Sequence, residues 1–363
     1  MPVSVPTLGS TLSISKLEAV ATDILRQAGM SHVNAGRMAG VLVFAQASGV
    51  DSHGLMHLPA YVTGMIDGTV TARPNFKILS VRPGAAILDG DNGPGVLVAL
   101  TAADRAIQCA ASTGVGSVAV RNSGHFGVAA AYVDRMVSRG MIGLVLSNAS
   151  PTVAPRGGTA AAFGTNPLAA GFPRKNGAAV IIDMATTNGS RARIRKAARE
   201  GESIPEDWAL DKNGNPTTNA EAALEGSMQA IGGAKGASLG LLVDMLCVAL
   251  SGGMIGPQVK APQNASGEKS GVSHLFIAFD TEAFGGVNLI AEKVEEIASA
   301  IEATPPADPQ QPVRMPGTRA ALRREQSRKN GIFMTEQLVD AFQRAIDIVD
   351  NAEAHPLRQP AEA

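Results

Sequence analysis

The apolar residues in the first eighty positions recur every three or four residues, which is the spacing of amphipathic helices. The pattern predicts a helix that opens with the capping-box sequence Ser15 to Glu18 and stops at Gly29, a second from Val33 to Gly49, and a third that follows the segment Asp-Ser-His-Gly and runs through Met65. His53 is thus expected at a helix start, where the helix dipole favours a neutral imidazole.

From about Phe76 short apolar runs alternate with amphipathic ones, which predicts an α/β domain. We expect residues 1–80, joined by a C-terminal helix at 331–352, to form an α-helical portion beside an α/β domain at 81–330. The apolar and amphipathic runs lie at 85–88, 96–111, 116–120, 128–138, 141–147 and 179–183, followed by a helix at 236–250, a strand at 274–279, helices at 287–301 and 335–349, and surface loops at 256–273 and 304–318.

Composition and net charge limit the kinds of molecule that the protein is expected to bind. The chain has 363 residues, 45% of them hydrophobic, and a formal net charge of -1, so no basic surface for nucleic acid or an anionic membrane is indicated. Its two cysteines, Cys109 and Cys247, lie far apart in apolar segments, and no signal-peptide pattern opens the chain. The apolar stretch 237–254 contains Asp244 and predicts a buried helix rather than a membrane span. A cytoplasmic protein with a small-molecule partner is expected.

Two histidines stand in small, polar surroundings: His53 in DSHG at 51–54 and His125 in NSGHFG at 122–127. Imidazole titrates near neutral pH, so a histidine with hydroxyl and amide neighbours is suited to proton transfer. The alternative interpretation is a pair of histidines in ordinary turns.

Three other motifs are weaker evidence for a functional site. Gly114 to Ala119 fits a dinucleotide-binding glycine pattern, but its glycines precede the predicted strand instead of following one, which argues against a Rossmann site. His53 and His57 have the spacing of a zinc-binding pair but lack the glutamate of that motif, so no metal is expected. Ser52 is in no nucleophile elbow, which disfavours a serine hydrolase.

Polar residues follow several predicted strands downstream, where α/β domains form their pockets. They lie in NASP at 148–151, FGTNP at 163–167 and DMAT at 183–186. Asp183 can accept hydrogen bonds from ribose hydroxyls or orient a histidine. Lys235, in the glycine-rich run at 232–236 ahead of a predicted helix, can bind a phosphate.

The motifs described above occur in a fixed order along the chain, together with the stretch from Trp208 to Thr218 and with Pro316-Gly317. In this order they resemble the malate/L-lactate dehydrogenase family of the second, non-Rossmann type. That family includes ureidoglycolate, sulfolactate and diketogulonate dehydrogenases and a cyclic imino-acid reductase. The resemblance implies NAD or NADP as cofactor, reversible reduction of a 2-oxo or cyclic 2-imino acid, and a homodimer with the cofactor near its interface. It implies an L-sulfolactate dehydrogenase-like α/β (α+β) fold, in which a mixed-sheet, non-Rossmann cofactor domain accompanies an α-helical portion.

The resemblance also implies roles for individual residues. His125 and His53, the latter backed by Ser52, are the proton-transfer candidates, and Asp183 belongs to the catalytic and cofactor sites. Thr165 and Asn166 would line the substrate pocket near the nicotinamide. The cofactor-binding candidates are Phe126, Gly127, Ser150, Asp183, Met184, Ala185, Lys235, Gly236, Pro316 and Gly317.

Two positions depart from the family pattern. His57 stands where the family usually has an arginine that would bind a substrate carboxylate, and a histidine offers one bond and a conditional charge. Arg156 is a candidate replacement. Thr318 stands where an acid often follows Pro-Gly. The cations at 191–196 would meet a cofactor 2′-phosphate or, as we expect, form a solvated helix face.

Alternatives remain open at this point. A cyclic 2-imino-acid reductase would deliver its proton to nitrogen instead of oxygen. From other classes, the chain could be a metal-dependent hydrolase using His53 and His57, or a protein that binds the cofactor but has lost catalysis.

Overall fold

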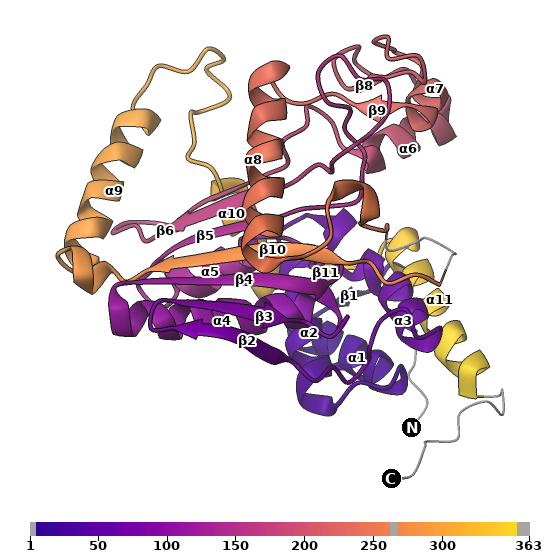
Figure 1. Ribbon diagram of the computed structural model, residues 1–363, viewed down its shortest axis with the longest axis horizontal. Helices are drawn as coiled ribbons and strands as arrows, with labels where there is room; N and C mark the ends of the chain where they lie inside the picture. Colours follow the sequence, from indigo (N-terminus) through magenta and orange to yellow (C-terminus); the bar gives the residue numbers. More distant parts are fainter. Residues whose placement is uncertain (1–4, 262–266, 354–363) are drawn as a thin grey trace.

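The computed structural model describes residues 5–261 and 267–353. Its centre is a seven-stranded mixed sheet of order β2-β3-β4-β10-β5-β6-β7 (Figure 1). Only β3 and β4 are parallel, joined by the crossover helix α4 (Gly95–Thr113), and the other pairs are antiparallel. The strands are β2 (Lys77–Arg82), β3 (Ala85–Asp89), β4 (Val115–Ser123), β5 (Ile142–Ser147), β6 (Leu168–Phe172), β7 (Val180–Met184) and β10 (Val272–Phe279).

This topology confirms the non-Rossmann fold. A Rossmann domain is a mostly parallel doubly wound sheet, whereas this sheet is mostly antiparallel. Gly114 ends α4 with a positive φ of 81°, and Gly116 is already inside β4. The glycines therefore precede the strand, and none opens a helix after it.

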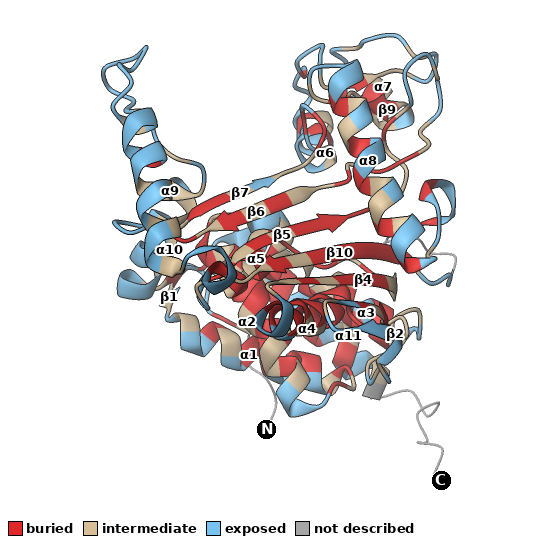
Figure 2. Cartoon of the chain, turned by 60° about the vertical axis from the view of Figure 1, so that its left-hand side comes forward, coloured by how far each residue is buried: buried red, intermediate tan, exposed pale blue. Residues whose placement is uncertain are grey.

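Alternation along the strands places helices on both faces of the sheet. Val118 and Val120 pack into the large core with α4 and α5 (Ala130–Val137), while Ala119 between them packs with α8 (Ala234–Ser251). Figure 2 shows the buried sheet between these two layers. The large core continues from the sheet into α1 (Ile14–Gln27), α2 (His32–Ala47), α3 (Leu58–Ile66) and α11 (Glu336–Glu353).

Two details of the N-terminal prediction are wrong. The cap of α1 is Ser13, whose hydroxyl accepts from the Lys16 N–H, so Ser15 lies inside the helix instead of capping it. His53 does not open an α-helix: it ends the 3-10 turn Asp51–His53, a second turn follows at Leu55–His57, and only then does α3 begin. The helix dipole is therefore not what keeps His53 neutral.

A smaller lobe with its own apolar core stands over the end of the sheet (Figure 1). It contains α6 (Arg191–Glu200), α7 (Ala220–Glu225) and the short pair β8 (Ala209–Leu210) and β9 (Ser227–Met228). The remaining elements are β1 (Thr11–Leu12) paired with β11 (Ile332–Phe333), α9 (Val287–Glu302), α10 (Thr318–Asn330), and 3-10 turns at Gly256–Gln258 and Thr281–Phe284. The predicted loop at 256–273 lies partly outside the described residues.

The helix α8 differs in part from its prediction. It is the one helix of the described residues that is long and apolar enough to cross a membrane. Gly240, Val243 and Cys247 are buried on its sheet side, but Leu242 and Met245 are exposed, so the expected buried helix is buried on one face only. The outer face of α8 thus exposes apolar side chains.

Candidate active site

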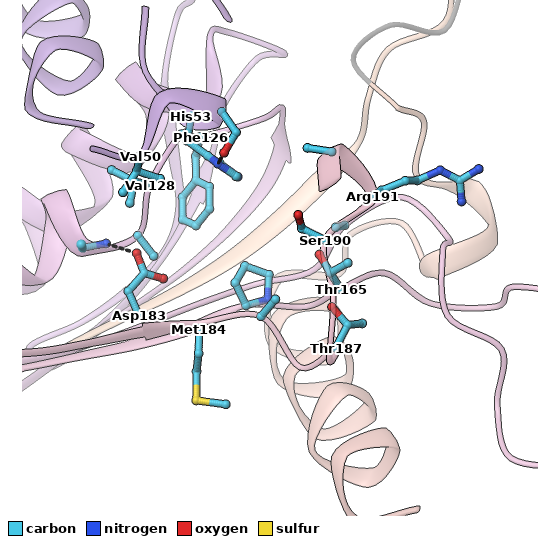
Figure 3. Close-up of a pocket in the computed structure, with 18 of the residues that line it drawn as sticks. Val50, His53, Phe126, Val128, Thr165, Asp183, Met184, Thr187, Ser190 and Arg191 are labelled. Carbon is cyan, nitrogen blue, oxygen red and sulfur yellow. Dashed lines mark hydrogen bonds between the residues drawn. The ribbon is translucent and has the colours of Figure 1, made fainter. Parts of the chain in front are cut away.

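A cavity of about 540 Å³ lies between the end of the sheet, the DSHG turns, α6 and the start of α10 (Figure 3). Its volume is within the roughly 300–1,000 Å³ of small-molecule and cofactor sites. Segments far apart in sequence meet there. The predicted site residues that line it are Ser52, His53, Phe126, Gly127, Ser150, Thr165, Asp183, Met184, Ala185 and Gly317.

His53 lines this cavity with one of its ring nitrogens hydrogen-bonded. Its Nδ1 lies 2.9 Å from the hydroxyl oxygen of Ser52, and its Nε2 has no hydrogen-bond partner among the described residues. Burial lowers the pKa of His53 below its ordinary value. The imidazole is therefore neutral at neutral pH, with a nitrogen free for proton transfer.

His53 belongs to a cluster of three imidazoles. The ring centroids of His53 and His125 are 5.5 Å apart, those of His57 and His125 are 4.6 Å apart, and those of His53 and His57 are 6.1 Å apart. Burial and the neighbouring rings lower the pKa of His57 to about 4 and that of His125 well below its ordinary value. Since like charges at this spacing repel, the cluster rests uncharged.

His125 and His57 line a small niche beside the main cavity instead of the cavity itself. The hydroxyl of Tyr61, on α3, lies 2.7 Å from Nδ1 of His125. Burial raises the pKa of Tyr61 far above its ordinary value, so the phenol stays protonated and fixes the orientation of the ring. Sequence reasoning missed Tyr61, although its position four residues after His57 places both on one helix face.

Another histidine that sequence reasoning treated only as part of a strand supports the cavity wall from behind. His274 of β10 is fully buried, with Nδ1 2.8 Å from the Ser147 hydroxyl and Nε2 2.8 Å from the Ser123 hydroxyl. Ser147 donates its own proton to the Asn148 carbonyl, so it accepts from Nδ1–H of His274, and Ser123 donates to Nε2. Both ring nitrogens are therefore used.

The ring of Phe126 rests on this histidine. It stacks on His274 with centroids 4.6 Å apart and on Tyr132 at 5.4 Å. The hydroxyl of Tyr132 donates to the Phe126 carbonyl. Phe126 is thereby held as a rigid apolar surface at the edge of the cavity (Figure 3).

Asp183 is the last but one residue of β7 and lies on the opposite side of the cavity from His53 (Figure 3). One carboxylate oxygen accepts from the Ala130 N–H at 2.8 Å, at the first residue of α5. The cavity walls raise the pKa of Asp183 by desolvation, and the Ala130 hydrogen bond acts in the opposite direction. The other oxygen is available as an acceptor for a hydroxyl of a bound ligand.

Two glycines of the cavity wall have backbone conformations that side chains rarely adopt. Gly127 and Gly317 line the cavity with φ of 74° and 87°. A Cβ on Gly317 would come within 2.9 Å of the Ile181 carbonyl oxygen. Close packing against β7 therefore requires glycine at 317, while the Asp183 carboxylate and the apolar ring of Phe126 offer an acceptor and an apolar surface to a bound ligand.

Several predicted site residues lie outside this cavity. Asn166 is fully buried, and its amide is used within the protein: Oδ1 accepts from the Ala149 N–H and Nδ2 donates to the Gly240 carbonyl. Arg156 is exposed and lines a second hollow of about 590 Å³ near the start of α8, where Lys235 and Gly236 form the first turn. The Pro316 carbonyl accepts from the Ile181 N–H.

The cations of the cavity come instead from Arg191 and Arg195 on α6 and Arg324 on α10. Arg193, Arg195 and Lys196 are exposed, as a solvated helix face predicts, although Arg195 also borders the cavity, and Arg191 is half-buried. Nothing in the sequence pattern of α10 links Arg324 to the site. Among the described residues, no group of three or more histidine, cysteine or acidic side chains could hold a metal ion.

Comparisons with known proteins agree with this fold. The family model of malate/L-lactate dehydrogenase matches residues 12–343. L-sulfolactate dehydrogenase of Methanocaldococcus jannaschii is 37% identical over 87% of this chain and 90% of its own length. The solved structure of sulfolactate dehydrogenase from that organism has a TM-score of 0.87 at 33% identity and covers 95% of this chain and 99% of its own.

Two further relatives are a second sulfolactate dehydrogenase and an imino-acid reductase. The (2R)-3-sulfolactate dehydrogenase (NADP(+)) of Chromohalobacter salexigens is 36% identical over 91% of this chain and 96% of its own length. The Delta(1)-pyrroline-2-carboxylate reductase of Pseudomonas fluorescens is 31% identical over 91% of this chain and 97% of its own length. With the mixed sheet and the cavity described above, these matches show that the chain belongs to the malate/L-lactate dehydrogenase family.

Proposed function

We propose that this protein is an oxidoreductase that transfers hydride reversibly between NAD or NADP and a small 2-hydroxy or 2-oxo acid. The observation that carries the proposal is the free Nε2 of His53 at a cavity whose opposite wall presents Asp183. Family membership supplies the reaction class, because sulfolactate and malate dehydrogenases are among its relatives.

The bound nicotinamide supplies or accepts the hydride, and the protein supplies the rest. Oxidation of a hydroxy acid needs a base for the hydroxyl proton, and a neutral imidazole with a free nitrogen is such a base. In the reducing direction the same nitrogen returns the proton to the developing alkoxide. We assign this transfer to His53 with Ser52 and to His125 held by Tyr61.

For the cofactor, we propose that Asp183 accepts from ribose hydroxyls and that the backbone near Ser150, Ala185 and Gly317 contacts the phosphates. Phe126, Gly127 and Met184 complete the nicotinamide surroundings in this proposal, and Thr165 lines the substrate space. Asn166 acts by holding the Asn148 to Pro151 segment in place, since its amide bonds to Ala149.

A second candidate reaction is reduction of a cyclic 2-imino acid. Likeness to the pyrroline-2-carboxylate reductase favours it. The same histidines would then deliver a proton to the imine nitrogen, so the two reactions need the same cavity and differ in substrate alone.

We further propose that the chain works as a cytoplasmic homodimer with neither nucleic acid nor a membrane as partner. The exposed apolar face of α8 supports a protein interface, and a contiguous apolar patch of this kind commonly marks one. Its members are Leu241, Leu242, Met245 and Leu250. Sedimentation of the wild-type chain tests the dimer, with Leu242→Glu as the variant expected to give monomers.

The enzyme assay follows absorbance at the reduced-nicotinamide band. Purified protein is offered NADH or NADPH with a panel of 2-oxo acids and cyclic 2-imino acids. Oxidation with any 2-oxo acid supports the leading reaction, and oxidation with imino acids alone supports the second. No oxidation across the panel, with bound cofactor confirmed, would refute both.

A further inference from the structure

The acid group of the proposed substrates needs a cation, and the histidines of the site do not supply one. His57 has a pKa of about 4, and burial also lowers the pKa of His53 and His125. All three are uncharged near neutral pH, so a carboxylate among them would gain hydrogen bonds but no opposite charge. A guanidinium, by contrast, keeps its charge and binds a carboxylate through two parallel hydrogen bonds.

Three arginines line the cavity, and two of them are already engaged. Arg324 donates to the Ser48 hydroxyl at 3.2 Å, pairs with Asp134 at 3.6 Å and lies over the ring of Phe44. Arg191 donates to the Leu224 carbonyl at 2.8 Å, and Figure 3 shows its side chain directed away from the centre of the cavity.

Arg195 is the third. It lies one helical turn after Arg191 on α6 and lines the cavity together with Ser52 and His53. Among the described residues it has no hydrogen bond or ion pair. Its side chain is exposed on α6 at the border of the cavity, and its charge is the smallest of the causes that lower the pKa of His57. Asp183 is the only acidic residue that lines the cavity within the described chain, and it is bonded to Ala130.

We propose that Arg195 binds the carboxylate of the substrate and so determines its specificity for small organic acids. This inference rests on the proposed function. If Arg195 on α6 binds the substrate carboxylate, the neighbouring carbonyl or imine carbon of the substrate would face the histidines. The substrate class is therefore a 2-oxo or 2-imino acid whose acid group is ionised across the neutral pH range.

The first test measures binding of an anion without turnover. Oxamate, an unreactive amide analogue of a 2-oxo acid, is titrated into wild type, Arg195→Gln, Arg195→Lys and the matched control Arg193→Gln, each with and without NADH. Trp208, the single tryptophan, reports binding, because its ring packs against Gly189 of the cavity wall. Calorimetry provides an independent readout.

Loss of a charge-assisted bond predicts that Arg195→Gln weakens oxamate binding about 10- to 100-fold. Arg195→Lys should restore part of the affinity, since lysine keeps the charge but not the paired geometry. Arg193, exposed on the same helix and outside the cavity, provides the control and should bind within about twofold of wild type. In turnover, Arg195→Gln should raise KM for the acid by the same factor and leave KM for the cofactor unchanged.

Three results would overturn the inference: no oxamate binding to the wild-type chain, equal binding by wild type and Arg195→Gln, or equal losses for Arg193→Gln and Arg195→Gln. A loss of NADPH affinity alone, with NADH and oxamate unaffected, would also overturn it and assign Arg195 to the 2′-phosphate. If oxamate binds through Arg195 but no acid is reduced, the anion site stands and the proposed function fails.

Discussion

His53 and His274 have similar partners but different surroundings. Each has a serine hydroxyl within 2.9 Å of a ring nitrogen, and burial lowers the pKa of both. In His274 a second serine hydroxyl, that of Ser123, binds the other ring nitrogen, so both nitrogens are hydrogen-bonded. Its strand β10 lies between β4 and β5. The second nitrogen of His53 is without a partner among the described residues, and His53 lines the cavity.

The contrast shows that a lowered pKa does not by itself identify a proton-transfer residue. Burial produces the same shift in a histidine that joins three strands and in one that faces a ligand cavity. What separates them is a ring nitrogen that is free to reach a substrate. His125, with Tyr61 on Nδ1 and no hydrogen bond on Nε2 among the described residues, shares the unpartnered nitrogen with His53, and it lines the niche beside the cavity.

The largest expected effect follows from removing a free nitrogen. His125→Gln should lower kcat by roughly 10²–10⁴-fold, the usual scale for lost acid–base catalysis, with NAD(P)H affinity and folding stability little changed. Steady-state kinetics and cofactor titration measure both. His32→Gln, at an exposed position on α2, is the control that should retain full activity. Undiminished turnover in His125→Gln would remove His125 from the mechanism.

His274, with both ring nitrogens hydrogen-bonded, should show the opposite pattern: its replacement should lower stability more than turnover. His274→Gln leaves two buried serine hydroxyls without their partner, at about 1–3 kcal/mol each. The free energy of unfolding should therefore fall by about 2–6 kcal/mol in urea titrations, while kcat falls by no more than about tenfold. A stable variant that had lost its turnover would break the distinction between the two kinds of histidine.

Acid should destabilise the folded protein through His274. Because the pKa of His274 is lowered to about 3, the folded form stays neutral where the unfolded chain, near pKa 6.5, takes up a proton. Its contribution is present above about pH 6.5 and is lost as the pH falls toward 3, by about 1.4 kcal/mol per pH unit. Urea midpoints at pH 7, 5.5 and 4.5 should decline less steeply in His274→Gln than in His32→Gln.

The smallest expected effect comes from removing the hydrogen bond between Tyr61 and His125. Tyr61→Phe removes the hydroxyl that fixes Nδ1 and should lower kcat about 5- to 10-fold, since one hydrogen bond contributes about 1 kcal/mol. Stability should change little, because the phenylalanine ring fills the same space. An activity loss as large as that of His125→Gln would indicate that Tyr61 takes part in the proton transfer itself.

Much of the fold followed from periodicity alone. The helices at 96–111, 236–250 and 287–301 and the strands at 116–120 and 141–147 lie within one to three residues of the observed α4, α8, α9, β4 and β5. Elements without an apolar stripe were missed. α10 has no buried residue, β2 is an exposed edge strand, and the Ala-Ala-Gly centre of β6 lacks the bulky residues of a typical strand.

The site was predictable where a motif carries its chemistry locally. DSHG, NSGHFG and DMAT contribute His53, Phe126 and Asp183 to one cavity. Contacts between distant segments could not be predicted in this way: Tyr61 meets His125 across 64 positions, and His274 meets Ser123 across 151. For the same reason Arg156 was a reasonable candidate cation in sequence, whereas the fold brings Arg195 to the cavity instead.

The most direct test of the account is the rate of hydride transfer in a single turnover, followed by reduced-nicotinamide absorbance with the best acid of the panel. Wild type, His125→Gln and His274→Gln are compared at saturating cofactor below their unfolding temperatures. The account predicts a roughly 10²–10⁴-fold slower transfer in His125→Gln and at most a tenfold change in His274→Gln. Equal rates in wild type and His125→Gln, or the larger loss in His274→Gln, would contradict the claim that a free ring nitrogen marks the catalytic histidine.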